Sequence, residues 1–446
     1  MLQDDSAGPP AAQRPAGTGR GLLARNTAWM AAGQGSRVVL GAAYFVVIAR
    51  ALHPDGLGAF AGAVALVALA SPFASLGAGN LLVKHVARDP RHFRRYWGGA
   101  LSTTIISGVV LGILIMAGAR LVLPSTIPFE VIGCVVAADL LFSRILDISG
   151  MAYQAHERLS RTAQFPLLIS VLRLFAAGAF TVIGDPTPGR WALWYLGSSA
   201  VAAIVSVGIT WRELGQPARV IGYPIGELRE GMYFATSLSA QNIYNDIDKS
   251  MLARLSTLEA TGIYSAAYRL IDVSFVPVRS LLAAAYPRFF QEGARGVRAS
   301  LKVARQLLPV AAGYATAAGL VLFLAAPLLP RILGADYEAS IEATRLLAIL
   351  PLLKSVHYFA ADTLTGAGYQ GRRTIAQIVV AAVNIGINIP LIAHASWRGA
   401  AWASIASDGL LALMLWTLLW ATCRYEDGLP GAAATTLGVA PTEAVS

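Results

Sequence analysis

The chain has 446 residues, of which 56% are hydrophobic and only 13% are charged, and its formal net charge is +10. Soluble proteins carry about 25% charged residues, so this composition, with a mean hydropathy of +0.58, excludes an ordinary soluble domain. We predict an all-α, polytopic membrane protein. Cys134 and Cys423 form no disulfide framework, and no metal-ligand spacing occurs, so we expect neither a metal nor a cofactor.

Taken in chain order, about twelve apolar stretches approach the roughly 20 residues that a spanning helix needs. The first follows Arg25 and is too long for a signal-peptide core, so we expect it to remain as a membrane anchor. The twelve centre near Arg37, Leu69, Val109, Asp139, Arg173, Val201, Asn242, Ile271, Ala315, Leu353, Val383 and Leu411.

Two segments 204 residues apart are similar in sequence. The segment that begins at Ala49 reads ARALHPDGLGAF, and the one that begins at Ala253 reads ARLSTLEATGIY. The shift places Gly58 on Gly262 and Phe60 on Tyr264, which predicts two pseudo-symmetric six-helix lobes around a central cavity. The expected organisation is a disordered N-terminus (1–24), an N-terminal lobe (25–210), an inter-lobe linker (211–231), a C-terminal lobe (232–422) and a disordered tail (423–446).

The connections between the predicted helices carry an uneven share of the basic residues. If the N-terminus is cytoplasmic, 21 Lys and Arg residues fall in cytoplasmic segments against 6 in outer turns, so we expect both termini in the cytoplasm. This bias accounts for the net charge, and nucleic-acid binding is not needed to explain it.

Eight basic residues remain within the predicted spans, and each is expensive there unless it pairs, snorkels or meets water. Three of them have an acidic residue three positions away, on the same helical face, which predicts structural pairs: Arg144–Asp147, Lys249–Asp246 and Arg269–Asp272. Arg345 lies near a helix end, where it can snorkel. Arg37, Arg173, Arg279 and Lys354 lack such a local partner.

Polar stripes on several helices indicate where the remaining charges gather. Tyr264, Tyr268, Asp272 and Arg279 share one face of the eighth span, which favours a wet cavity between the lobes over a dry hydrogen-bonded seam. Guanidinium groups match phosphate, and tyrosine rings stack on sugars, so such a cavity suits an anionic, sugar-bearing head group. Within the spans, Asp139, Asp272, Asp362 and Asp408 are candidates to carry a coupling proton or sodium ion, or plain structural counter-ions.

The chain resembles the O-antigen and exopolysaccharide flippases of the multidrug/oligosaccharidyl-lipid/polysaccharide exporter superfamily. The resemblance lies in RNTAWMAAGQGSRVVLGAAYFVVIARALHPDGLGAF of the first lobe and in IYNDIDKSMLARLSTLEATGIYSAAYRL, AAYPRFF and TGAGYQGRRT of the second. It implies alternating access and transfer of an undecaprenyl-pyrophosphate-linked oligosaccharide to the outer leaflet of the bacterial inner membrane. It also implies a cationic central cavity, placed here on Arg37 and on Arg269 or Arg279.

We therefore expect a non-enzymatic flippase whose partners are the lipid-linked oligosaccharide, the membrane and a polysaccharide polymerase complex. The expected cargo-binding residues are Arg37, Arg173, Arg269, Arg279, Lys354, Tyr264 and Tyr268. A small-molecule or drug antiporter and a peptidoglycan-precursor flippase of the same superfamily remain as alternatives. A membrane enzyme is disfavoured because the outer loops are too short to hold a catalytic site.

Overall fold

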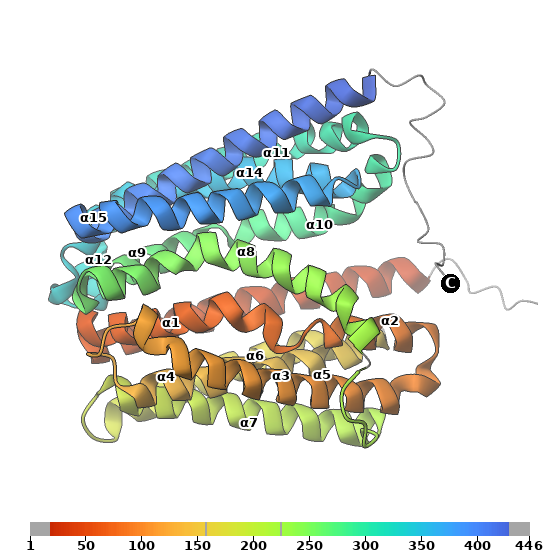
Figure 1. Ribbon diagram of the computed structural model, residues 1–446, viewed down its shortest axis with the longest axis horizontal. Helices are drawn as coiled ribbons and strands as arrows, with labels where there is room; N and C mark the ends of the chain where they lie inside the picture. Colours follow the sequence, from red (N-terminus) through yellow and green to blue (C-terminus); the bar gives the residue numbers. More distant parts are fainter. Residues whose placement is uncertain (1–17, 157, 224, 428–446) are drawn as a thin grey trace, which may run out of the picture.

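The computed structural model describes residues 18–156, 158–223 and 225–427, and within them the chain is helical with no strands. Figure 1 shows helices that run side by side in two groups, with α1–α7 in one and α8–α15 in the other, and α8 lies on the side of its group that faces the first. The predicted all-helical membrane fold is confirmed. Six helices of the described chain, or seven with the bent pair α9–α10, are long and apolar enough to span by themselves, so the count of twelve stays a prediction.

The first group contains α1 (Thr18–Ala70), η1 (Ser71–Ala74), α2 (Ala78–Arg88), η2 (Pro90–His92), α3 (Phe93–Val122), α4 (Phe129–Val136), η3 (Ala137–Phe142), α5 (Ser143–Ala155), α6 (Leu159–Val182) and α7 (Pro188–Leu214). The second contains α8 (Ile225–Leu255), α9 (Leu258–Ser274), α10 (Val276–Gly293), α11 (Val297–Ala325), η4 (Ala326–Leu328), α12 (Leu329–Leu333), η5 (Ala335–Tyr337), α13 (Ser340–Leu347), α14 (Leu350–Gly366) and α15 (Gln370–Asp427). Outward faces are apolar, as lipid requires: Ile113, Ile204 and Val321 are 64%, 68% and 63% exposed.

Two of the helices are too long to cross a bilayer once. At 1.5 Å per residue, the 53 residues of α1 and the 58 of α15 would each extend about 80 Å or more, against a hydrocarbon core of about 30 Å. Each is interrupted by a residue with positive φ, His53 at 57° and Ser396 at 51°. The red start of α1 and the blue end of α15 lie at one end of the bundle, here called the terminal end, and α1 turns at the other, the distal end (Figure 1).

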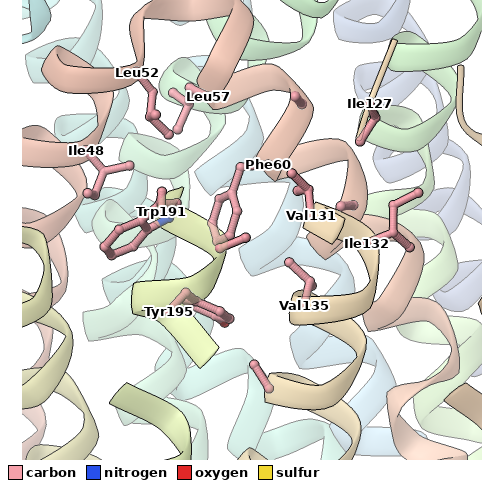
Figure 2. Packing of buried hydrophobic residues seen from close by; sticks show 14 of the residues in the cluster. Ile48, Leu52, Leu57, Phe60, Ile127, Val131, Ile132, Val135, Trp191 and Tyr195 are labelled. Carbon is pink, nitrogen blue, oxygen red and sulfur yellow. The ribbon is translucent and has the colours of Figure 1, made fainter. Parts of the chain in front are cut away.

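The first lobe is packed around an aromatic cluster where α1 meets α4 and α7 (Figure 2). The Trp191 side chain is fully buried, and its ring centroid lies 5.9 Å from that of Phe60 and 6.1 Å from that of Tyr195. Aromatic pairs of this geometry contribute about 0.5–1.5 kcal/mol each beyond area burial. They hold the distal part of α1 to its own lobe.

At the distal end the two lobes meet through a contact that is made twice. A Cβ atom on Gly58 would lie 1.8 Å from the carbonyl oxygen of Leu258, and one on Gly262 would lie 1.9 Å from that of Pro54. The shift of 204 residues places Gly58 on Gly262 and Pro54 on Leu258, so each contact is the symmetry mate of the other. The sequence repeat therefore corresponds to a pseudo-two-fold relation between α1 and α9.

A polar latch surrounds this glycine contact. Arg50 donates from Nε to the carbonyl oxygen of Ile332 at 2.5 Å and from Nη2 to that of Arg331 at 2.9 Å. The His53 ring nitrogen Nδ1 lies 2.7 Å from a carboxylate oxygen of Asp336. These contacts join α1 to α12 and η5, so the distal end is closed.

The connection between the lobes is shorter than the predicted linker 211–231. Its first residues belong to α7 and those from Ile225 onward to α8, so the non-helical part runs from 215 to 223, here called the linker strap. The strap lies along α3: the Ala218 amide donates to the Arg94 carbonyl at 2.8 Å, and the Gly222 amide donates to Ser102 Oγ at 2.9 Å.

Both predicted disordered termini overlap helix. α1 begins at Thr18, inside the expected segment 1–24, and α15 continues to Asp427, past the expected boundary at 423. The rest of these two predictions, residues 1–17 and 428–446, lies outside the described residues.

Candidate functional site

A cavity of about 750 Å³ lies in the second lobe, on the side of the first. Its walls come from α8, α9, α10, α14 and the start of α15, and most of the side chains are polar. They are Gln241, Asn242, Asn245, Asp246, Tyr268, Arg269, Asp272, Arg279, Leu282, Ala283, Tyr286, Lys354, Tyr358, Asp362 and Arg373. Just before α15, Tyr369 donates to Glu426 near the end of that helix at 3.1 Å, which places this part of the wall toward the terminal end.

Four cationic side chains and three carboxylates line the cavity. Arg373 Nη1 lies 3.1 Å from Asp362 Oδ1, and Asp246 is bonded to Lys249 on the same helix. Arg269 and Arg279 make no ion pair within the described part of the chain. The cavity therefore presents two guanidinium groups that no carboxylate of the described chain contacts.

One predicted local pair does not form. Arg144 and Asp147 lie 3.2 Å apart, and Lys249 bonds Asp246, but Arg269 and Asp272 make no ion pair although both line the cavity. Arg269 Nε is buried without a hydrogen-bond partner, and the guanidinium carbon lies 5.8 Å from the centre of the Phe45 ring. Spacing on one helical face permits a pair but does not require it.

Lys354 has partners that its own helix does not supply. Its ammonium group lies 2.8 Å from Asn245 Oδ1 and 3.5 Å from Asp408 Oδ2, and it is 4% exposed. Asp408, on α15, also lies 3.3 Å from His357 Nε2. Lys354 has no carboxylate partner on its own helix, and its partner Asp408 comes from a distant part of the sequence.

The first lobe has a polar cluster of its own. Arg173 lies 3.7 Å from Asp139 Oδ1 and 4.2 Å from the centre of the Tyr195 ring, and the Tyr195 hydroxyl donates to Asp139 at 2.9 Å. Asp139 lies in η3, a π-helical segment, a rare distortion often found at functional sites. Arg173, too, is therefore partnered from a different helix.

The structure gathers some of the predicted site residues and separates others. Arg269, Arg279, Lys354 and Tyr268 line the cavity with two of the candidate coupling acids, Asp272 and Asp362. The others lie elsewhere. Arg37 is exposed on α1, Tyr264 is buried against Asp248 and Ser404, Arg173 and Asp139 belong to the first-lobe cluster, and Asp408 lies behind Lys354.

A second, smaller chamber of about 220 Å³ adjoins the cavity, since Asp246, Arg269 and Asp272 line both. We call it the inter-lobe chamber, because α1 of the first lobe forms one wall and α8 and α9 form the other. Its lining is Tyr44, Phe45, Ile48, Leu57, Phe60, Ala61, Val64, Ala65, Ala68, Asp246, Lys249, Ser265, Arg269 and Asp272.

Sequence reasoning missed two members of the lining, the amide of Asn245 and Arg373, which the charge count places in a cytoplasmic connection. The RR pair after TGAGYQG carried no sign that one arginine turns back toward Asp362. Within the described residues, no group of three or more His, Cys, Asp or Glu side chains could hold a metal ion.

The sequence profile of a family described as polysaccharide biosynthesis protein matches residues 23–292. Among solved structures, an inward-facing multidrug resistance MATE family transporter of the MOP superfamily superposes with a TM-score of 0.70 at 17% identity, covering 87% of this chain and 96% of that one. A MOP superfamily transporter from Pyrococcus furiosus, described as having a binding pocket of reverse polarity, gives a TM-score of 0.60 at 16% identity, covering 90% of this chain and 95% of that one. These likenesses establish the fold. A comparison with curated proteins gives no significant match.

Proposed function

Because the chain belongs to the polysaccharide biosynthesis protein family, we propose that it is a flippase for an undecaprenyl-pyrophosphate-linked oligosaccharide. The cargo would pass from the cytoplasmic to the outer leaflet of the bacterial inner membrane, with ion coupling. The transporter fold and the several apolar spans support a multi-pass membrane carrier.

The observation that carries the proposal is the pair of guanidinium groups, Arg269 and Arg279, that line the cavity without a carboxylate partner among the described residues. A charge within the bilayer is expensive, on the order of 2.5–3.5 kcal/mol on the most lenient scale. An anionic ligand offsets this, and guanidinium binds phosphate oxygens in a bidentate manner. Lys354 and Arg373 line the same cavity and are paired with Asp408 and Asp362.

The closed distal end suggests the direction of access. The cavity wall includes Arg373, near the terminal end, while Arg50 and His53 latch the distal end. We assign the terminal end to the cytoplasm from the excess of Lys and Arg in the connections there. In this state the cavity would accept cargo from the cytoplasmic leaflet while the lipid tail stays in the bilayer.

The test is transfer of a fluorescent undecaprenyl-pyrophosphate oligosaccharide across proteoliposomes. Removing one charge-assisted interaction costs about 1.5–3 kcal/mol, so Arg279→Gln and Arg269→Gln should each weaken cargo binding by about 10-fold or more. Arg345→Gln is the matched control, because Arg345 contacts Phe323 outside the cavity. Unchanged transport in both cavity variants would rule out this site.

A drug antiporter is the second candidate, and one observation favours it: Asp272 lines the cavity without an ion-pair partner among the described residues. It predicts that Asp272→Asn abolishes efflux of a cationic dye while Arg279→Gln does not. The flippase predicts the opposite order of effects. If the chain is instead a peptidoglycan-precursor flippase, its expression should rescue the growth of cells depleted of their own peptidoglycan-precursor flippase.

A further inference from the structure

The inter-lobe chamber lies beyond Arg269 as seen from the cavity, and its lining reaches Leu57, next to the distal glycine contact. Arg279, Lys354 and Arg373 line the larger cavity, and none of them lines the chamber. At about 30 Å³ per water molecule, its 220 Å³ would hold about seven waters. That is the scale of a single ring and not of an oligosaccharide.

Two hydrogen-bond donors on the α9 wall of the chamber have no partner. Ser265 is 7% exposed, and its hydroxyl makes no hydrogen bond; Arg269 Nε is buried and equally unsatisfied. The two residues are four apart on one helix, so both side chains face the same way. Buried polar groups are nearly always hydrogen-bonded, and an unsatisfied one is destabilising unless a ligand or water completes it.

The opposite wall is aromatic. Tyr44, Phe45 and Phe60 come from α1, and Phe45 faces Arg269 with its ring centre 5.8 Å from the guanidinium carbon. Tyr44 is fixed by stacking on Trp191 at 6.5 Å, and Phe60 by its edge contact with Tyr195 at 5.1 Å. Rings held in this way offer flat apolar faces without a further loss of side-chain freedom.

The charged residues that line the chamber favour an uncharged occupant. Asp246 and Lys249 form an ion pair, and the chamber is also lined by one guanidinium, Arg269, and one carboxylate, Asp272, so its formal charges sum to zero. Carboxylate oxygens accept hydrogen bonds from hydroxyl groups but repel a second carboxylate. Apolar faces, orphaned donors and acceptors around a ring-sized space together describe a site for a polyhydroxylated ring.

We propose that the inter-lobe chamber binds the sugar ring attached directly to the pyrophosphate, and that it selects a neutral hexose. The proposal rests on the proposed function, since the pyrophosphate would be held next door at Arg279, Lys354 and Arg373. Ser265 and Arg269 Nε would donate to ring hydroxyl oxygens, Asp272 would accept from a hydroxyl group, and Phe45 would stack against the apolar face.

The test compares three probes on the full-length protein in nanodiscs by isothermal titration: undecaprenyl pyrophosphate, the same lipid bearing one glucose, and the same lipid bearing one glucuronic acid. We expect the glucosyl lipid to bind about 10-fold more tightly than the bare lipid, and the glucuronosyl lipid to gain nothing. Ser265→Ala and Phe45→Leu should each reduce the glucose advantage about fivefold while leaving the affinity for the bare lipid unchanged.

Matched controls are Ser274→Ala, whose hydroxyl donates to Ile271 within α9, and Phe175→Leu, which is 72% exposed on the outer face of α6. Both should keep the full advantage. Binding of the bare lipid reports that each variant is folded. If parent protein binds bare and glucosyl lipids equally, or if both chamber variants keep the advantage, the chamber holds only water and the proposal falls while the flippase stands. If parent protein does not bind even the bare lipid, both proposals fall.

Discussion

The twofold glycine contact between α1 and α9 offers the sharpest perturbation of the closed distal end. In Gly58→Ala the new methyl group would lie 1.8 Å from the Leu258 carbonyl oxygen, whereas ordinary contact begins at 3.4 Å. The helices must therefore separate by about 1.6 Å, and overpacking of this kind costs about 1–3 kcal/mol. If the contact exists only while the distal end is closed, that equilibrium shifts by about 5- to 150-fold toward the distally open state.

The assay is the distance between spin labels placed at Asp55 and Glu338, two exposed positions on opposite lobes near the contact, in protein whose Cys134 and Cys423 are replaced by alanine. Gly58→Ala and Gly262→Ala should each broaden the distribution toward longer distances. The shift in distance for the double variant should be smaller than the sum of the two single shifts, because one separation of α1 from α9 relieves both clashes.

Gly208→Ala in α7 is the control, since a Cβ atom there meets nothing within 4 Å. It should leave the distances unchanged. If Gly58→Ala and Gly262→Ala also give the parent distribution, the glycine contact does not govern closure and the reasoning from its geometry is refuted.

Three further outcomes follow. Lys354→Met should lower the free energy of unfolding in detergent by about 3–5 kcal/mol, because it leaves Asp408 buried without its ammonium partner, and adding Asp408→Asn should restore most of the loss; an equally unstable double variant would contradict this. Gly98→Ala places a methyl group 2.0 Å from the Ala218 carbonyl and should make the linker strap more susceptible to limited proteolysis, whereas unchanged cleavage would show that the strap is not held there. In the turn after α2, side-chain and backbone hydrogen bonds from Arg91 hold the pKa of Asp89 below its usual value, so protection of this turn from hydrogen exchange should be full above the ordinary carboxyl pKa and fall as the pH drops through the lowered one. Arg91→Ala removes the side-chain bonds and keeps the backbone one, so it should move the step to higher pH, and an unmoved step would contradict this.

Much of the architecture could be predicted because a membrane leaves few choices. Apolar length selects helices, and the repeat that pairs Gly58 with Gly262 anticipated a contact that the structure makes twice. Part of the site could be predicted from the free-energy cost of placing a charge within the bilayer. A cation such as Arg279 or Lys354 within a span needs water, a partner or a ligand.

The remaining site contacts could not be predicted, because they join residues on different helices that are far apart in the sequence. Lys354 finds Asp408 and Arg173 finds Asp139 across helices, and no spacing rule on one helix can anticipate either pair. Arg373 was counted as a loop charge, although its side chain returns to Asp362 on the cavity wall. The charged residues within the predicted spans therefore indicated that a polar cavity exists, but they did not identify all of the residues that line it.

The linker strap has a mechanical consequence. A free connection of nine residues could wander about 15–18 Å from end to end, but one fastened to α3 fixes the point from which α8 starts. The 31 residues of α8 then act as a lever about 46 Å long. A rotation of α8 by about 15°, a size typical of rigid-body rotations in allosteric proteins, would move its far end by about 12 Å. A small rotation beside α3 is therefore enough to separate the helices at the opposite side of the membrane.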